Sequence, residues 1–243
     1  MTGDAPDSPE QIPRFPVETP TPPSPGDPLA AKLRGFGPLG IVTMLVIIAF
    51  GPVLEPLGAV LVLAWVRRSH TPWSEIGYVR PKSWIGALAV GFALGIAFKF
   101  LMKVIVMPLL GAPPINPAYH YLAGNSAALP GMLFAVTVGA GFGEETVYRG
   151  YLFERLGKLF GRGVGATTAI VLLNSAWFGL IHYPVQGLAG AEQAAIVGLV
   201  YGTIFARTGR IWMLMFAHAA FDVTAVLMIY WNLESSVAHL VFK

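Results

Sequence analysis

The chain has 243 residues, of which 55% are hydrophobic and 12% charged, and its mean hydropathy is +0.63. These values exclude an ordinary soluble domain and predict a membrane protein. The net charge of +3 arises from basic residues in loops between apolar segments, so we interpret it as a topology signal and not as a nucleic-acid surface.

The first 33 residues are rich in Pro, Asp and Ser and contain no apolar run. A segment of this composition cannot bury a core, so we expect a disordered tail over 1–33. The remainder, 34–243, is expected to form one transmembrane domain. Because the chain contains no cysteine, disulfides, thiolate metal sites and a cysteine nucleophile are excluded.

Apolar segments follow the tail, most of them close to the ~20 residues that a helix needs to cross a bilayer. They predict an all-α fold, a polytopic transmembrane helical bundle of six to seven spans. The number is open because Glu55 and two prolines interrupt the first segment, which forms either one kinked helix or a hairpin of two. The segments are 37–66, 84–110, 130–154, 164–182, 190–206 and 211–231.

The charges of the loops predict how the bundle is oriented. Basic residues occur in the loops 67–82, 155–162 and 207–210, whereas 111–129 and 183–189 contain no Lys or Arg. By the positive-inside rule, the three basic loops are cytoplasmic. A hairpin in the first segment would then leave the N-terminus inside, and a single span would place it outside.

The stretch "GFGEETVYRG" places three charged residues in an apolar segment. Glu145 and Arg149 are four residues apart, so on a helix they share a face and can form an ion pair. Glu144 lies about 100° around the helix from Glu145. A desolvated carboxylate of this kind can act as a general base when a histidine is within reach.

Two later segments carry similar polar pairs. "FGLIH" places Phe178 and His182 four residues apart, and "HAAFD" does the same for His218 and Asp222. Ionisable residues are costly inside a membrane, so their presence in three separate spans favours a functional site over simple helix–helix contacts. The motifs HExxH and GxGD, and a GxSx motif paired with a late histidine, are absent, which leaves glutamate and histidine chemistry.

The three motifs together resemble those of one family. "EETVYR" (144–149), "FGLIH" (178–182) and "HAAFD" (218–222) occur in order, and the sequence over roughly 127–232 resembles the CPBP family of intramembrane proteases. This family is also called the Abi or CAAX prenyl protease 2 family. The resemblance implies an intramembrane endopeptidase, a hydrolase described both as a glutamic endopeptidase and as a metalloprotease.

The resemblance also implies roles for individual residues. Glu144 and His182 would activate the attacking water, with Glu145 and Arg149 supporting them. His218 and Asp222 match the pair assigned to stabilising the oxyanion. Because a carboxylate cannot donate a hydrogen bond unless it is protonated, we expect Asp222 to orient His218 and His218 to donate.

The same residues could also hold a metal ion. A Zn²⁺ ion would be held by Glu144, His182 and His218, but the nearby Arg149 opposes a divalent cation. We therefore expect catalysis without a cofactor, with a divalent metal as the alternative.

The implied substrate is a membrane-associated protein or peptide, including prenylated CAAX-type peptides, at the plasma membrane. The alternative is a non-enzymatic bacteriocin-immunity-like or partner-binding membrane protein. Lys99 and Lys103 share a helix face at membrane depth. They either line a cavity that receives a substrate carboxylate, pair with Glu55, or extend towards lipid headgroups.

Overall fold

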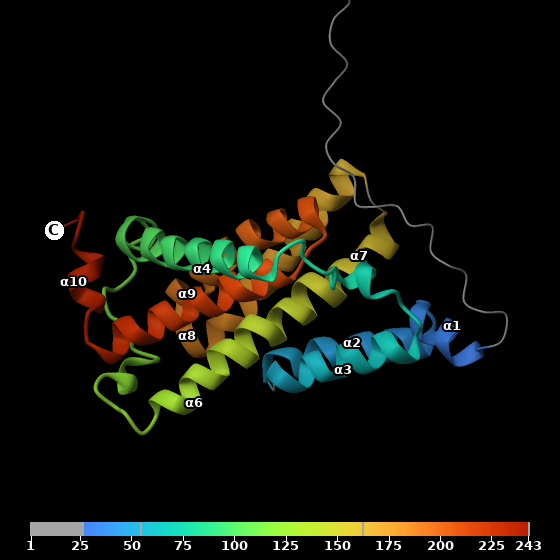
Figure 1. Ribbon diagram of the computed structural model, residues 1–243, viewed down its shortest axis with the longest axis horizontal. Coiled ribbons are helices and arrows are strands. Elements are labelled where there is room, and N and C mark those ends of the chain that lie inside the picture. The colour runs from blue at the N-terminus through green and yellow to red at the C-terminus, as the bar shows by residue number, and fades with distance from the viewer. Residues whose placement is uncertain (1–26, 54, 162, 243) are drawn as a thin grey trace, which may run out of the picture.

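The computed structural model describes residues 27–242 except 54 and 162, and every regular element in this part of the chain is helical (Figure 1). The longer helices are α2 (Pro38–Val53), α3 (Glu55–Arg68), α4 (Trp84–Leu101), η4 (Ala135–Leu152), α8 (Val164–Thr208) and α9 (Trp212–Tyr230). The shorter ones are α1 (Pro28–Arg34), η1 (Trp73–Ile76), η2 (Met102–Val106), α5 (Met107–Leu109), η3 (His120–Leu122), α6 (Leu129–Phe134), α7 (Phe153–Phe160) and α10 (Glu234–Ala238).

The chain becomes helical before the expected end of the tail. Asp27 caps α1, since its carboxylate accepts hydrogen bonds from the backbone N–H groups of Leu29 and Ala30 at 3.0 and 3.1 Å. Trp65 of α3 donates its indole N–H to the carbonyl of Leu33 at 3.1 Å and so ties α1 to the bundle. The rest of the expected tail, residues 1–26, lies outside the described residues.

The first apolar segment forms two helices, α2 and α3, which run side by side (Figure 1). The end of α3 returns to α1, because Trp65 near its last turn contacts Leu33. This is the hairpin alternative. Both ends of the segment therefore lie at the same end of the bundle, which is the end that the loop charges predict to be cytoplasmic.

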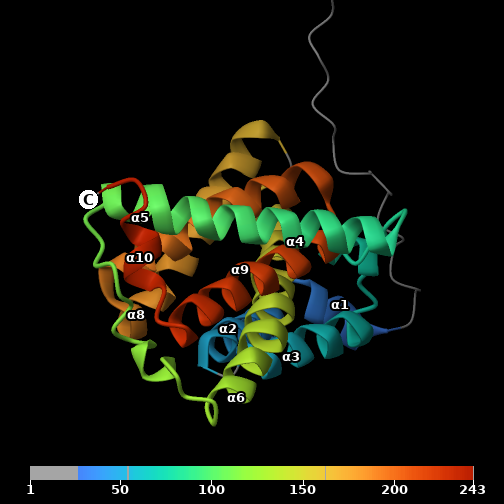
Figure 2. The same cartoon turned by 60° about the vertical axis from the view of Figure 1, so that its left-hand side comes forward.

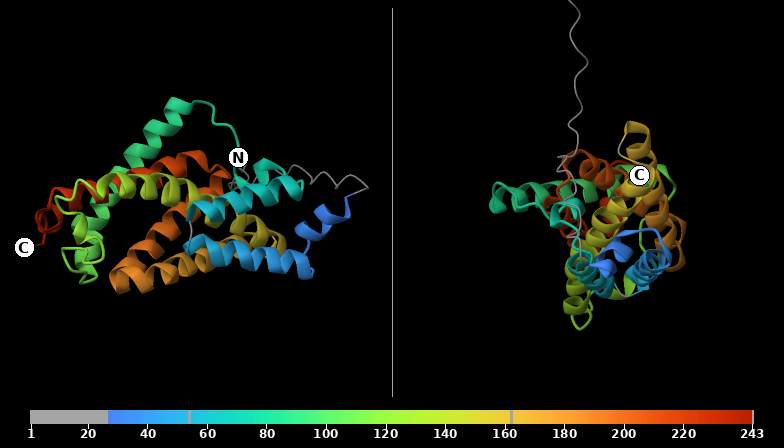
Figure 3. Two further views of the ribbon diagram at one scale, coloured as in Figure 1. Left: turned by 90° about the horizontal axis from the view of Figure 1, so that it is seen from below. Right: turned by 90° about the vertical axis from the view of Figure 1, so that its right-hand side faces the viewer.

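Helix α8 folds back on itself at Gly187, whose φ of 65° and ψ of −165° interrupt the helix. The two halves touch: a Cβ added to Gly179 would lie 2.8 Å from the carbonyl oxygen of Ala191, and one added to Gly198 would lie 2.9 Å from the Cα of Ser175. These pairings run antiparallel, and the turn is visible in Figure 3. The expected segments 164–182 and 190–206 thus correspond to two antiparallel helices on either side of the break at Gly187.

The expected six to seven spans are not confirmed. In the described part of the chain, three helices are long and apolar enough to cross a membrane: Trp84–Leu109, Val164–Thr208 and Trp212–Tyr230. A fourth is added if the bent pair Pro28–Arg34 and Pro38–Phe50 is one span. The count falls because α2 and α3 have only 16 and 14 residues, α8 counts once although it is bent, and η4 carries three charged residues.

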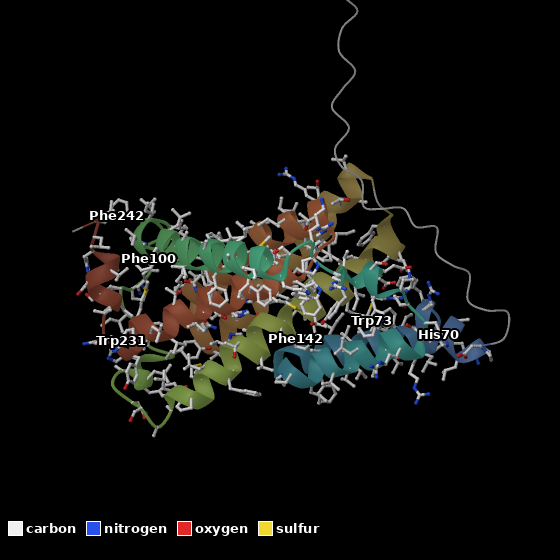
Figure 4. The ribbon with its side chains drawn as sticks, in the orientation of Figure 1. His70, Trp73, Phe100, Phe142, Trp231 and Phe242 are labelled. Atoms are coloured by element: carbon white, nitrogen blue, oxygen red, sulfur yellow. The ribbon has the colours of Figure 1, made fainter. Side chains whose placement is uncertain are left out.

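The outer surface of the bundle is apolar, as an integral membrane protein requires. Large side chains such as Phe100 and Trp231 are exposed and lie away from the centre (Figure 4). The polar loops lie at the two ends of the bundle. At one end, Lys158 pairs with Glu75 at 3.0 Å. At the other end, Gln186 donates to the Tyr119 hydroxyl at 3.2 Å. The basic loops 67–82 and 155–162 therefore share an end, as their charges predicted.

Small residues allow three helices to approach closely at the centre, where α4 crosses α9 (Figure 2). A Cβ on Gly95 of α4 would lie only 2.1 Å from the carbonyl oxygen of Ala217 in α9. A Cβ on Gly141 of η4 would lie 2.8 Å from the Cβ of Ala219. Glycine at these two positions therefore lets η4 and α4 pack directly on α9, and this contact brings the polar motifs together.

Candidate active site

The first motif lies on η4, which is wound as a π-helix. Glu144, Glu145 and Arg149 are all buried. Arg149 pairs with Glu145 at 2.9 Å between Nη1 and Oε1, as their spacing predicted. The guanidinium also lies over the ring of Phe178, with 4.7 Å from Cζ to the centroid. The ion pair and the aromatic ring together fix this charge inside the bundle.

His182, on the first half of α8, is oriented by its own helix. Its Nδ1 lies 2.7 Å from the carbonyl oxygen of Phe178. Since a carbonyl can only accept, Nδ1 carries the donated proton, and in a neutral ring Nε2 keeps its lone pair. Nε2 lies 3.9 Å from Oε1 of Glu144. The second motif thus presents an acceptor nitrogen to the carboxylate of the first.

His218, on α9, lies among three carboxylates. Its Nδ1 is 2.8 Å from Oε1 of Glu145, while its Nε2 is 3.6 Å from Oε2 of Glu144 and 3.5 Å from Oδ2 of Asp222. Both ring nitrogens therefore face acceptors, which suits a ring that donates from both. Asp222, which we expected to orient His218, lies beside Nε2, whereas the fully buried Glu145 lies at hydrogen-bond distance from Nδ1.

The six residues predicted from the sequence therefore come together, four at the cavity wall and two behind it. Glu144, His182, His218 and Asp222 line a cavity of about 560 Å³. Glu145 and Arg149 lie behind this wall and hold His218 in place. The cavity is large enough for a small ligand or a short peptide segment.

Two supporting residues were missed by the sequence reasoning. Asn174 donates from Nδ2 to the backbone carbonyl of Tyr148 at 2.7 Å and so links α8 to η4. The sequence did contain a signal for Asn174, because it precedes Phe178 and His182 at helical spacing and so shares their helix face. Tyr201 packs its ring 5.8 Å from that of His218. It looks like any other core aromatic in the sequence, so nothing there marked it.

A third support reaches η4 from the loop between α3 and α4. The hydroxyl of Thr146 donates to the carbonyl of Phe142 at 2.6 Å, so the Tyr78 hydroxyl must donate to Thr146, at 2.8 Å. The phenol of Tyr78 is protonated at physiological pH, and burial raises its pKa further, to about 12. Tyr78 therefore anchors the turn that carries Glu144 and Glu145.

Within residues 27–242, leaving aside 54 and 162, no group of three or more His, Asp or Glu side chains is placed to hold a metal ion. His218 directs Nδ1 to Glu145 at 2.8 Å and faces Glu144 with Nε2 at 3.6 Å. The positive charge of Arg149, which pairs with Glu145, would repel a divalent cation near these side chains.

The motif-bearing part of the chain matches a known protein family. Residues 126–224 match the model described as Rce1-like, type II CAAX prenyl endopeptidase Rce1-like. This range contains all three motifs, so the family resemblance seen in the sequence is confirmed there. Comparison with curated proteins and with solved structures finds no match.

Proposed function

Because residues 126–224 are similar to type II CAAX prenyl endopeptidases, we propose that the protein is an intramembrane endopeptidase in which Glu144 and His182 activate water. The observation that carries this proposal is the pairing of Glu144 Oε1 with His182 Nε2 across 3.9 Å at the cavity wall. A water oxygen placed ~2.8 Å from each acceptor fits this gap. Its two hydrogens would then point at the protein and its lone pairs at the substrate.

The chemical steps follow from these positions. The water oxygen forms a bond to the scissile carbonyl carbon while Glu144 takes one proton from it. The oxyanion of the tetrahedral intermediate is stabilised by the Nε2–H of His218, which Glu145 holds in place through Nδ1. The C–N bond then breaks, and the proton held by Glu144 passes to the leaving amine. Each step is an acid–base or nucleophilic step that these side chains can carry.

The substrate is proposed to be a membrane-associated protein or peptide, including prenylated CAAX-type peptides. Two features support this. The matched family is that of type II CAAX prenyl endopeptidases, and the apolar outer surface is suited to contact with lipid-anchored chains in the bilayer. We propose the plasma membrane as the location.

The test compares the native protein with Glu144→Gln, which keeps the side-chain shape and removes the base. Peptide termini are mapped by mass spectrometry in membranes of cells that express each form at equal levels. The matched control is Glu192→Gln, the same substitution on α8 at a residue that does not line the cavity. We expect termini that appear with the native protein and the control and disappear with Glu144→Gln. Identical termini in all three would support the non-enzymatic, partner-binding alternative.

A further inference from the structure

The cavity contains a cation that the chemistry above does not use. Lys99 of α4 is 7% exposed and lines the same cavity as Glu144, His182 and His218. A buried ammonium group costs free energy unless an anion or several acceptors compensate it, so its local partners matter.

The partners of Lys99 are nearly all neutral. Its Nζ donates to the amide oxygen of Gln193 at 3.2 Å and lies 4.7 Å from the ring centroid of Phe221. Among the residues that the structure describes, no carboxylate oxygen lies within 4.0 Å of it. Asp222 also lines the cavity, but its ion pair is with His218. The suggested pairing with Glu55 concerns a side chain outside the described part of the chain.

Lys103, the next basic residue on the same wall, provides a direct contrast. Its Nζ donates to the carbonyl of Pro114 at 2.6 Å and pairs with Glu234 at 3.4 Å. Its charge is therefore already compensated inside the protein. Of the two lysines proposed from the sequence as carboxylate receivers, only Lys99 lacks an ion pair among the described residues.

We infer that Lys99 binds the free C-terminal carboxylate of the substrate. The inference rests on the proposed function and narrows it to cleavage close to the C-terminus. The position fits this role, because Phe221, which Lys99 contacts, follows His218 by three residues, or ~4.5 Å along α9. A C-terminal fragment of two or three residues spans roughly 7–10 Å, so its terminal carboxylate reaches past the His218 side chain.

Gln193 completes this carboxylate site. Its amide oxygen accepts from Lys99, which leaves its NH₂ group available to donate to a second carboxylate oxygen. Gln193 comes from the second half of α8, so the site depends on the turn at Gly187. The site is thus built from α4 and α8, whereas the water-activating pair comes from η4 and the first half of α8.

The test uses one fluorescent peptide that ends in a prenylated cysteine followed by three apolar residues, prepared as the free acid and as the C-terminal amide. Binding of both peptide forms is measured in nanodiscs with the full-length Glu144→Gln protein. Cleavage of both forms is measured with the protein that keeps Glu144. Each measurement is repeated after Lys99→Gln and after Lys103→Gln, which is the same change at the compensated lysine. Every variant must elute as a single symmetric peak in size-exclusion chromatography, which shows that it is folded.

We expect the free acid to bind at least about tenfold more tightly than the amide, because a charge-assisted hydrogen bond replaces a neutral one. Lys99→Gln should remove this preference while leaving amide binding unchanged, and Lys103→Gln should keep it. Equal binding of acid and amide to the Glu144→Gln protein, or a preference that survives Lys99→Gln, overturns the inference. Lys99-dependent acid binding without any cleavage supports the carboxylate site and counts against the proposed function instead.

Discussion

Replacing Arg149 by methionine should destabilise the protein strongly, because it leaves the carboxylate of Glu145 buried without its cation. Both side chains are 0% exposed and lie 2.9 Å apart. Removing one partner of a buried ion pair costs about 3–5 kcal/mol. Here His218 still contacts Glu145 at 2.8 Å, so we expect the lower end, about 3 kcal/mol. For a chain of this length that corresponds to a decrease in Tm of roughly 6–12 °C.

The assay is thermal unfolding of the purified protein in detergent, followed by tryptophan fluorescence. Arg207→Met serves as the control, since Arg207 is exposed on the last turn of α8 and should change Tm little. The double variant Glu145→Gln, Arg149→Met removes both charges and should recover part of the lost stability, because the effects of substitutions at two contacting residues are not additive. A Tm for Arg149→Met within ~2 °C of the native value would refute the reasoning, and so would strict additivity in the double variant.

Three further results are expected. Asp222→Asn should lower kcat/KM by less than about tenfold in a peptide-cleavage assay, since Glu145 makes the shorter contact to His218; a loss as large as that of Glu145→Gln would contradict this. Gly95→Ala should destabilise by about 2–3 kcal/mol in thermal unfolding through its clash with α9, whereas Gly131→Ala, with no atom within 4 Å of the added Cβ, should not. Cleavage should survive 1,10-phenanthroline and EDTA, since the described residues form no metal-binding group; inhibition reversed by zinc would contradict this.

The sequence predicted local features of the fold well. The Glu145–Arg149 pair, the helical character of the apolar segments and the sharing of an end by basic loops follow from spacing and composition. The count of spans did not follow, because hydropathy registers apolar stretches and not whether a helix is straight, short or bent. The reversal at Gly187 falls within 183–189, the loop that the sequence predicts between two apolar segments, but the sequence does not mark which residue in that loop makes the turn.

By itself, the sequence determined that this is a membrane-embedded helical protein with three polar motifs and a family relationship over 126–224. These features depend on residues within one or two helical turns of each other, or on composition. The tertiary structure decided which residue meets which across helices. It placed Glu145 and not Asp222 at hydrogen-bond distance from His218, and it gave Lys103 an ion pair while leaving Lys99 with neutral partners. These contacts arise from packing between segments far apart in the chain, which no local pattern encodes.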